Sequence, residues 1–510
     1  MNFSKLPVLA AIILVLSLTG LTACSSEEKG TSTQIDTSEA EDKGENGGQT
    51  GSSPSAITDG SRLDTSALFT ERDLNTSWSA TAATKIVFEN DKIQVDGNGA
   101  EAADNKLTLS AGGTYVVSGT LSDGQIVVDV TKNEKVRLVL DSVDLTCSDS
   151  ACILIKEADK VFITLADGSE NFLSDTGAAY VQTDDTMNVD AVVFSKSDLV
   201  FNGNGSLSVE AGYHDAVVSK DDLKFIGGTY DIKAADKAIV GKDSVRIKDG
   251  TFTIVSQDDA LHTSNEEKEG KGYIFIGGGI FNIMTGDDAL HAATAIVVKD
   301  GTINIPQCYE GFEADTIDID GGSVSITSVD DGLNASLSAG GSSDDDDVAA
   351  GGGNTVQTGC YICISGGTVN INSEGDGFDS NGSIIVEGGS IVIDGPVNDG
   401  TSSLDAGTDI LLNGGTIISV GSAGMAKAPS EKSGQYSVFY IFPDKISGGT
   451  QVDLLNRKGK SICSFTPAKD WSCLILSTPD LGKGTYTIKA GDKEAQIEIS
   501  SMVSASSQGE

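Results

Sequence analysis

Acidic residues recur once in each repeat of about 22 residues, and this recurrence is the feature of the sequence with the most chemical content. Each acid lies nine residues after a glycine, and a second polar residue follows three positions later. The acids are Asp259, Asp288, Glu310, Asp331 and Asp376. The polar residues that follow them are His262, His291, Glu313, Asn334 and Asp379. Carboxylate, amide and imidazole groups are common protein ligands of metal ions, so the pattern predicts cation binding.

Short alternating segments follow the repeated glycines and indicate the elements that position these acids. Residues 251–254, 302–305 and 368–371 each place an apolar side chain at every second position, as a half-buried strand does. The glycine-to-glycine distances from Gly228 to Gly415 are 22, 29, 22, 21, 45, 22 and 26 residues. A fixed period of this size without a helical pattern predicts an all-β fold, a parallel β-helix whose stacked coils share one interior. The two longest intervals are then coils with loop insertions.

Stacking of coils gives the acids their physical meaning, because equivalent side chains of neighbouring coils lie about 4.8 Å apart. Two carboxylates at that distance repel by roughly 3.5 kcal/mol at an effective dielectric constant near 20. Protonation, hydrogen bonding or bound cations must therefore neutralise them. Calcium takes oxygen ligands at about 2.3–2.6 Å and would fit between two such acids. The alternative is that the aspartates only accept hydrogen bonds from turn amides.

Composition and charge narrow the class of function. The chain has 510 residues with 61 Gly, 8 Pro and 5% aromatic residues, which suits a long solenoid with many turns. Its formal net charge of -41 argues against binding to nucleic acid and to anionic lipid. The same charge disfavours an anionic polysaccharide as ligand, unless divalent cations bridge the two.

The N-terminus predicts an extracellular address. Lys5 precedes an apolar run over residues 8–18, and Leu-Thr-Ala-Cys follows at residues 21–24. A short apolar segment with a basic flank is typical of a secretory signal peptide, with an uncleaved anchor as the alternative. The tetrapeptide matches the bacterial lipobox, so we expect a signal peptide over residues 1–24 and a lipid anchor on Cys24 at the outer face of the cell membrane. Residues 25–62 are rich in Ser, Thr, Gly and Glu and are predicted to be a disordered tether.

The remaining chain divides into a long solenoid and a small C-terminal unit. We expect the β-helix over residues 63–430, with residues 63–84 covering its open end and coils beginning near Lys85. Residues 431–510 have longer strand patterns and predict a small β-sandwich-like unit. The acidic, Gly-rich stretch at residues 338–359 is expected to be a mobile excursion from one coil.

Seven cysteines remain after Cys24. Two pairs, Cys147 with Cys152 and Cys463 with Cys473, are close enough in sequence to form local disulfides in an oxidising exterior. Cys360 and Cys363 have a metal-like spacing, but they lie on an alternating strand without a second such pair, so zinc is not expected there.

Several longer motifs carry a family resemblance. They are Gly-Asp-Gly-Phe-Asp-Ser-Asn-Gly at residues 375–382, Gly-Gly at 388–389, Asp-Gly-Pro at 394–396, residues 421–426, residues 330–336 and the start at residues 69–74. From about residue 63 to 500 the chain resembles a bacterial carbohydrate-binding β-helix lipoprotein family that is related to the family 9 pectate lyases. The resemblance implies a right-handed parallel β-helix that binds calcium and plant cell-wall polysaccharide, particularly acidic sugars such as polygalacturonate, with cellulose as a further candidate.

The resemblance also implies ligands for calcium. The related lyases build their site from an Asp-Asp-x-x-Asp cluster and an acid one coil away. The corresponding residues here are Asp330, Asp331 and Asn334, with Glu310 and Glu313 on the preceding coil and Asp376 and Asp379 on the following coil. A second set departs from the family pattern because it offers imidazole. Its members are Asp258, Asp259, His262, Asp287, Asp288 and His291. Histidine suits zinc, manganese or nickel better than calcium, and the alternative for both histidines is an ordinary polar turn position.

Three classes of function fit these features: a non-catalytic, calcium-dependent polysaccharide binder, a calcium-dependent lyase, and an adhesin that calcium only rigidifies. A lyase needs a general base near the ion. The cations of the regular coils show no placement in the sequence that links them to the acids. These cations are Lys237, Arg246, Lys248, Lys271 and Lys299. We therefore predict a binding protein without catalytic residues.

Overall fold

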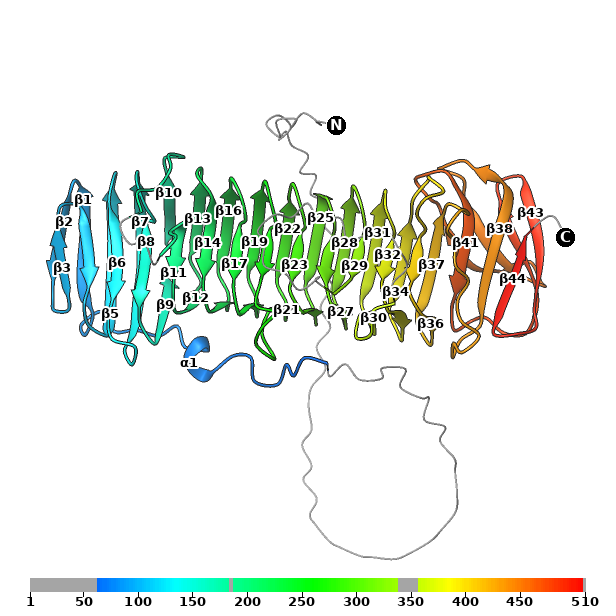
Figure 1. The fold of residues 1–510 in the computed structure, drawn as a ribbon, viewed down its shortest axis with the longest axis horizontal. Helices are drawn as coiled ribbons and strands as arrows, with labels where there is room; N and C mark the ends of the chain where they lie inside the picture. Colours follow the sequence, from blue (N-terminus) through cyan, green and yellow to red (C-terminus); the bar gives the residue numbers. More distant parts are fainter. Residues whose placement is uncertain (1–61, 183–186, 338–355, 508–510) are drawn as a thin grey trace, which may run out of the picture. The chain divides into compact units, whose positions relative to one another are not determined.

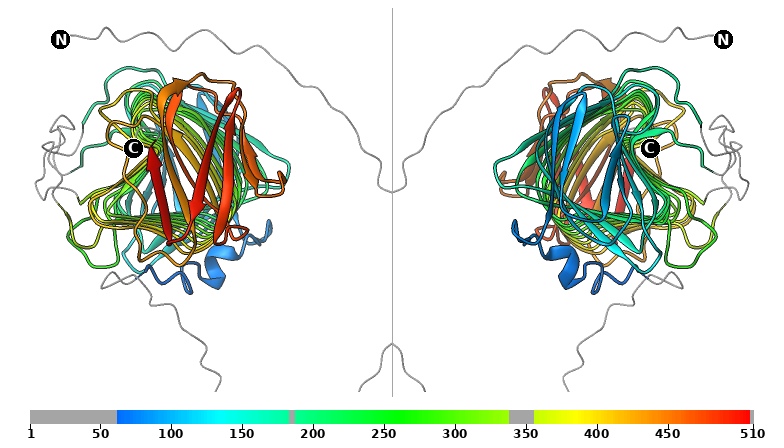
Figure 2. Two further views of the ribbon diagram at one scale, coloured as in Figure 1. Left: turned by 90° about the vertical axis from the view of Figure 1, so that its right-hand side faces the viewer. Right: turned by 90° about the vertical axis from the view of Figure 1, so that its left-hand side faces the viewer.

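Successive coils of the chain stack through parallel strand pairing, and the computed structural model describes residues 62–182, 187–337 and 356–507. The predicted parallel β-helix is confirmed (Figure 1). The predictions for the signal peptide, for Cys24 and for the tether up to residue 61 lie outside the described residues, as do residues 338–355 of the predicted excursion. In views along the stack, equivalent strands of neighbouring coils superimpose around a common interior (Figure 2).

The regular coils contribute strands to three faces. The first face contains β9 (Lys160–Leu165), β12 (Asp198–Gly203), β15 (Asp222–Phe225), β18 (Ser244–Ile247), β21 (Tyr273–Ile276), β24 (Ala295–Val298), β27 (Thr316–Ile319), β30 (Tyr361–Ile364), β33 (Ser383–Val386) and β36 (Ile410–Leu412). The second contains β10 (Glu170–Asp175), β13 (Ser206–Ala211), β16 (Thr229–Ala234), β19 (Thr251–Ser256), β22 (Ile280–Met284), β25 (Thr302–Cys308), β28 (Ser323–Ser328), β31 (Thr368–Ser373), β34 (Ser390–Asp394) and β37 (Thr416–Gly421). The third contains β6 (Gln125–Asp129), β8 (Ile153–Glu157), β11 (Ala191–Ser195), β14 (Asp215–Ser219), β17 (Ile239–Gly241), β20 (Leu261–Thr263), β23 (Leu290–Ala292), β26 (Phe312–Ala314), β29 (Leu333–Ala335), β32 (Phe378–Ser380) and β35 (Leu404–Ala406).

Apolar side chains fill the interior because every second residue of a strand points inward. On the second face, Phe252 and Phe281 are register partners, and their rings stack with centroids 4.8 Å apart. Such columns of stacked apolar side chains bury apolar area from coil to coil, and this burial is the main stabilising contribution.

Two kinds of glycine explain why the repeat is visible in the sequence. Gly322 adopts a φ of 78° at the start of the second face, and a Cβ there would lie 2.6 Å from the carbonyl oxygen of Gly301. Gly332 directly follows the acid Asp331, and a Cβ there would lie 2.5 Å from the carbonyl oxygen of Gly377. Neither position accommodates a side chain without a shift of the neighbouring coil.

Antiparallel strands end the stack on both sides. At the N-terminal end, β1 (Thr84–Asn90) pairs with β2 (Lys92–Asp96), and β3 (Ala100–Ala103) pairs with β4 (Lys106–Leu109). Two long strands, β5 (Gly113–Leu121) and β7 (Lys135–Cys147), then lead into the coils.

At the C-terminal end, β37 pairs antiparallel with β41 (Trp471–Ser477), which also pairs with β38 (Ser437–Ile446). The last strand, β44 (Val503–Ser507), adds to β38. A separate sheet contains β39 (Val452–Asn456), β40 (Ser461–Phe465), β42 (Gly484–Ala490) and β43 (Lys493–Ile499). A second core that includes Trp471 and Ile488 lies in this part of the chain, consistent with the predicted β-sandwich-like unit.

The expectation that residues 63–84 cover the open end of the solenoid is wrong. This segment, which we call the strap (residues 62–79), runs along the outside of the first face (Figures 1 and 2). Leu68 packs against Phe275, and the Arg62 guanidinium lies 3.4 Å from Asp318. The strap binds there because it buries apolar side chains of the first face and supplies ion-pair partners to its charged side chains.

One buried ion pair fixes the strap. The helix α1 (Glu71–Leu74) begins at Thr70 with a capping box, in which Asp73 and Thr70 exchange hydrogen bonds. Asp73 is fully buried, and its carboxylate lies 2.9 Å from the ammonium of Lys224 and 3.4 Å from that of Lys160. Among the described residues, no helix is long and apolar enough to cross a membrane.

Replacement of Asp73 by Ala is expected to release the strap. The change leaves Lys224 buried without its partner, at a cost of about 1–3 kcal/mol that strap release relieves by exposing the lysine to water. Limited proteolysis should then cut within residues 62–79 faster than in the parent protein. Glu71→Ala, on the exposed side of the same helix, is the matched control and should leave the rate unchanged. Equal cleavage of parent and Asp73→Ala would show that the ion pair does not hold the strap.

All seven cysteines of the described chain are free thiols, so neither proposed local disulfide is present. Cys473 packs in the main β-helix core, whereas Cys463 packs against the second core, so the two point into different interiors. Cys152 is fully buried, and its thiol donates to the carbonyl of Ser174 at 3.0 Å. Cys147 is also buried, and its thiol contacts Asp149 at 3.8 Å.

Candidate metal-binding columns

The repeated acids lie in the turns between the second and third faces, one above the other. We call them the inner column: Asp259, Asp288, Glu310, Asp331 and Asp376. One carboxylate oxygen of most members accepts the backbone N–H of the next rung. These distances are 3.1 Å from Asp288 N to Asp259, 3.2 Å from Glu310 N to Asp288, and 2.6 Å from Asp376 N to Asp331. The amide of Ser402 donates to Asp376 in the same way. The turn-amide hydrogen bonds weighed as an alternative are thus present, but each uses only one oxygen.

The second set of polar residues lies on the third face. We call it the outer column: His262, His291, Glu313, Asn334, Asp379 and Asp405. Each is the middle residue of a three-residue strand from β20 to β35, and consecutive members are register partners. Their side chains are half-buried and point outward, because the residues on either side of each are buried. The sequence pattern therefore placed its two sets side by side correctly.

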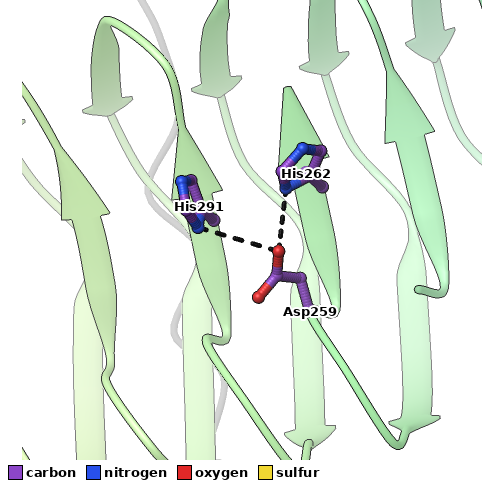
Figure 3. Close-up of side chains that lie close together, drawn as sticks. All are labelled: Asp259, His262 and His291. Atoms are coloured by element: carbon purple, nitrogen blue, oxygen red, sulfur yellow. Dashed lines mark hydrogen bonds and ion pairs between the residues drawn. The ribbon is translucent and has the colours of Figure 1, made fainter. Parts of the chain in front are cut away.

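The free oxygens of the inner column face the outer column. Asp259 Oδ2 lies 2.8 Å from His262 Nδ1 and 3.7 Å from His291 Nδ1 (Figure 3). On the next coil, Asp288 Oδ2 lies 3.3 Å from His291 Nδ1. One coil further, the Asn334 amide donates to Glu310 Oε2 at 3.0 Å. The two columns thus form one continuous strip of ligand atoms.

Residues one position before the inner column add a flank of oxygen donors. Asp258, Asp259 and Asp287 bring one carboxylate oxygen each within 4.8 Å of one another. Further along, the Tyr309 hydroxyl hydrogen-bonds to Asp330, and together with burial this raises the pKa of Tyr309 to about 12. Both predicted ligand sets are therefore located on this strip.

A lysine closes the strip at each end, and sequence reasoning missed both. Lys237 occupies the inner column one coil before Asp259, with its ammonium 2.7 Å from Asp258 and 3.8 Å from Asp259. The prediction that Lys237 has no link to the acids is therefore wrong. Lys427 forms an ion pair with Asp405 at the other end.

The other coil cations lie elsewhere. Arg246 and Lys271 pair with Asp222 at 2.8 and 3.1 Å, and Lys299 pairs with Asp320. These acids lie at the first face, away from the two columns.

The columns extend beyond the predicted residues. Asp405 was missed because Ser402 stands where an acid was required, although Leu404-Asp405-Ala406 repeats the Leu333-Asn334-Ala335 pattern. Toward the N-terminus, both ring nitrogens of His214 lie 3.0 Å from carboxylates, those of Asp215 and Asp236. These hydrogen bonds raise the pKa of His214 to about 10.

Carboxylates in the middle of the strip are crowded and form no ion pair with a cationic side chain of the described residues. We call Glu310, Asp330, Asp331, Asp376 and Asp379 the central cluster. Within the described ranges, none of these five carboxylates forms an ion pair with a lysine, arginine or histidine, although the charge of Lys427 acts on Asp379 from a greater distance and lowers its pKa in part.

Crowding and burial raise the pKa values of carboxyl groups in the central cluster. Burial, together with the charges of Glu310 and Asp376, raises the pKa of Asp331 to about 10. Burial likewise raises the pKa of Asp376 to about 7 and that of Asp379 to about 6. By contrast, although burial opposes ionisation, the hydrogen bond from His262 and nearby cationic charge lower the pKa of Asp259 to about 2.

This donor set fits a hard dication. Five carboxylates and the Asn334 amide supply oxygen ligands, each inner carboxylate keeps one oxygen free of the turn amides, and an ion would replace the protons that crowding otherwise holds there. The chemistry available is cation binding and cation-mediated contact with an anionic ligand.

Part of the chain is similar to a family of known proteins. Residues 103–344 match the model of a family described as carbohydrate-binding domain-containing protein. The match includes Asp259, Asp288, Glu310 and Asp331 and ends before Asp376. The predicted family resemblance is thereby confirmed for this stretch.

Two relatives make the similarity concrete. A carbohydrate-binding domain-containing protein of Acetivibrio thermocellus is 39% identical over 151 residues, which are 29% of this chain and 53% of the relative. This chain therefore spans about half the length of that relative. The solved structure of the polysaccharide lyase-like protein from C. thermocellum, a gadolinium derivative, is 36% identical and covers 44% of this chain and 90% of its own, with a TM-score of 0.43.

Proposed function

We propose that this protein binds an acidic polysaccharide outside the cell without cleaving it, through calcium ions held by the central cluster. The observation that carries the proposal is the crowding of Glu310, Asp331, Asp376 and Asp379, which form no ion pair with a cationic side chain of the described residues. The family description of residues 103–344 supports a carbohydrate ligand.

Calcium explains how a chain of net charge -41 recognises an anionic sugar. The ion has six to eight oxygen ligands, so protein carboxylates need not fill its coordination shell. The remaining positions can take the carboxylate of a uronate, as in polygalacturonate. The half-buried outer column leaves the strip accessible to such a chain along the third face.

The lysines nearest the strip argue against catalysis. Abstraction of a proton from a uronate needs a neutral amine. Burial lowers the pKa of Lys237, but the carboxylates of Asp259, Asp258 and Asp236 raise it by more, so this lysine stays protonated. The ammonium of Lys427 is held by the Asp405 carboxylate and by the carbonyl of Ala406 at 2.9 Å.

A calcium-dependent lyase is the second candidate, because Lys427 does lie beside the outer column. Release of unsaturated oligogalacturonides, detected by their ultraviolet absorbance in the presence of calcium, would favour that candidate. Protein that calcium stabilises but that binds no polysaccharide would instead be an adhesin rigidified by the ion.

Asp331→Asn and Asp376→Asn are each expected to weaken binding to polygalacturonate by about tenfold or more, since each removes a charged ligand of the ion. The amide keeps the oxygen that accepts the turn hydrogen bond, so the coils stay folded. Affinity is measured by co-sedimentation with the polysaccharide in calcium. Asp231→Asn removes the same charge from the exposed second face and should change nothing. Parent protein that keeps its full affinity in chelator would overturn the bridging mechanism.

We also propose the lipid anchor on Cys24, on the basis of the lipobox at residues 21–24. Cys24→Ala should move the protein from the detergent phase to the aqueous phase of a Triton X-114 partition. A cleaved Cys24→Ala product that still enters the detergent phase would contradict the anchor.

A further inference from the structure

The start of the strip differs chemically from the central cluster, because two imidazoles stand there on adjacent coils. His262 in β20 and His291 in β23 are register partners, and their ring centroids lie 5.0 Å apart. Both rings direct Nδ1 toward the inner column (Figure 3). The chain has only three histidines in total, so a high histidine content does not explain why two of them lie side by side here.

We propose that Asp259, His262 and His291, with Asp288 and Glu313, form a site for a first-row transition dication such as zinc, separate from the calcium-binding central cluster. Imidazole nitrogen suits such ions, whereas calcium prefers oxygen alone.

The spacing of ligand atoms supports the site. Zinc binds nitrogen and oxygen at about 2.0–2.2 Å, which places tetrahedral ligands about 3.3 Å apart. His291 Nδ1 lies 3.3 Å from Asp288 Oδ2, 3.5 Å from Glu313 Oε2 and 3.7 Å from Asp259 Oδ2, and His262 Nδ1 lies 2.8 Å from Asp259 Oδ2. Small side-chain rotations would bring four of these atoms to one ion.

Charge and access are also suitable. Three carboxylates contribute negative charge, and the Lys237 ammonium, 2.7 Å from Asp258 and 3.8 Å from Asp259 Oδ2, offsets only part of it. The side chains of His262 and His291 are 17% and 28% exposed, whereas those of Asp259 and Asp288 are 4% and 6% exposed. An ion would thus arrive through the imidazoles and meet buried carboxylates below them.

Turn hydrogen bonds preorganise the carboxylates. Asp259 and Asp288 are each fixed by the backbone N–H of the following rung on one oxygen, which leaves the other oxygen pointing at the imidazoles. Such outer contacts orient metal ligands and hold them in place before the ion binds.

The test is a calorimetric titration of the full chain, made without a histidine tag. Zinc is the titrant, and the buffer contains excess calcium throughout. The titration measures zinc without any polysaccharide, and the histidine variants report on this site whether or not calcium binds the central cluster, so the result does not depend on the proposed polysaccharide function. We expect one zinc ion per chain, and a loss of affinity of at least about tenfold to 100-fold in His262→Gln and in His291→Gln. The double variant should bind no zinc at this site.

His214→Gln is the matched control, because it removes the third histidine, which also contacts two carboxylates, and it should retain the parent affinity. Asp259→Asn keeps the amide-accepting oxygen and should weaken zinc binding with an unchanged circular dichroism spectrum. Cobalt should give a visible absorption band in the parent and not in the double variant. Absence of saturable zinc binding, or unchanged stoichiometry in a folded double variant, would overturn the proposal.

Discussion

Calcium is expected to raise the free energy of unfolding by about 3 kcal/mol or more once the free ion exceeds its dissociation constant several-hundredfold. The physical reason is the central cluster, where Asp331 and Asp376 are buried beside other carboxylates. An ion that binds only the folded state neutralises this crowding and draws the equilibrium toward it. The measurement is the urea midpoint at neutral pH in calcium and in chelator.

A double variant, Asp331→Asn with Asp376→Asn, should lose most of the calcium effect while becoming more stable in chelator, since neither amide has to take up a proton when the chain folds. Asp231→Asn, on the exposed second face, serves as the control. Equal midpoints with calcium and with chelator would mean that the acids serve only the turn amides, and the calcium proposal would then fail.

In chelator, stability is expected to fall by about 2 kcal/mol or more between pH 5 and pH 8. Asp376, Asp379 and Asp331 have folded pKa values raised to about 7, 6 and 10 from 3.8. Above pH 4 the folded state therefore binds more protons than the unfolded state, so stability decreases as pH rises through the folded values. The raised pKa of His214, about 10, adds to the same trend above its unfolded value of 6.5.

Asp259 contributes with the opposite sign, but only at low pH. Its folded pKa of about 2 lies below the ordinary value, so its contribution is complete above pH 4 and is lost as pH falls toward 2. The chelator experiment at pH 5 to 8 therefore reports groups with raised pKa values, namely the central cluster together with His214 and His291. Calcium should make the stability less dependent on pH, because bound ions replace the protons on the central-cluster carboxyls. A metal-free protein that is more stable at pH 8 than at pH 5 would show that these carboxylates are ionised without a partner.

The architecture was predictable because the repeat has a local physical cause. A glycine such as Gly322 is required where one coil's backbone passes close to the next, so it recurs at the coil period. Alternating residues such as Phe252 and Ile254 face the interior and reveal the strands. Equal offsets from a repeated glycine also mean equal places in stacked coils, which is why two sets of residues far apart in the sequence form adjacent columns.

The position of the strap and the two lysines at the ends of the strip, Lys237 and Lys427, could not be predicted from the repeat. Asp73 finds Lys224 across 151 positions of sequence, and nothing local to either residue encodes the contact. Lys237 was missed because it occupies an acid's place in the column, and a search for acids excludes it. The disulfide prediction failed because short sequence separation does not fix where a thiol points: Cys463 and Cys473 pack against different cores, and the Cys152 thiol donates to a backbone carbonyl.

The reversed strands at the two ends have a consequence for self-association. A stack of parallel strands has open edges, and a second molecule could continue it coil by coil into a fibre. Here β2 and β3 run antiparallel to their neighbours at one end and carry charged residues such as Lys92 and Asp96. At the other end, the antiparallel pairing of β41 with β37 occupies that edge. On the second face of the described stack, another copy's regular coil therefore cannot pair directly with β37, whereas the flank of the same stack presents its ligand atoms at every coil.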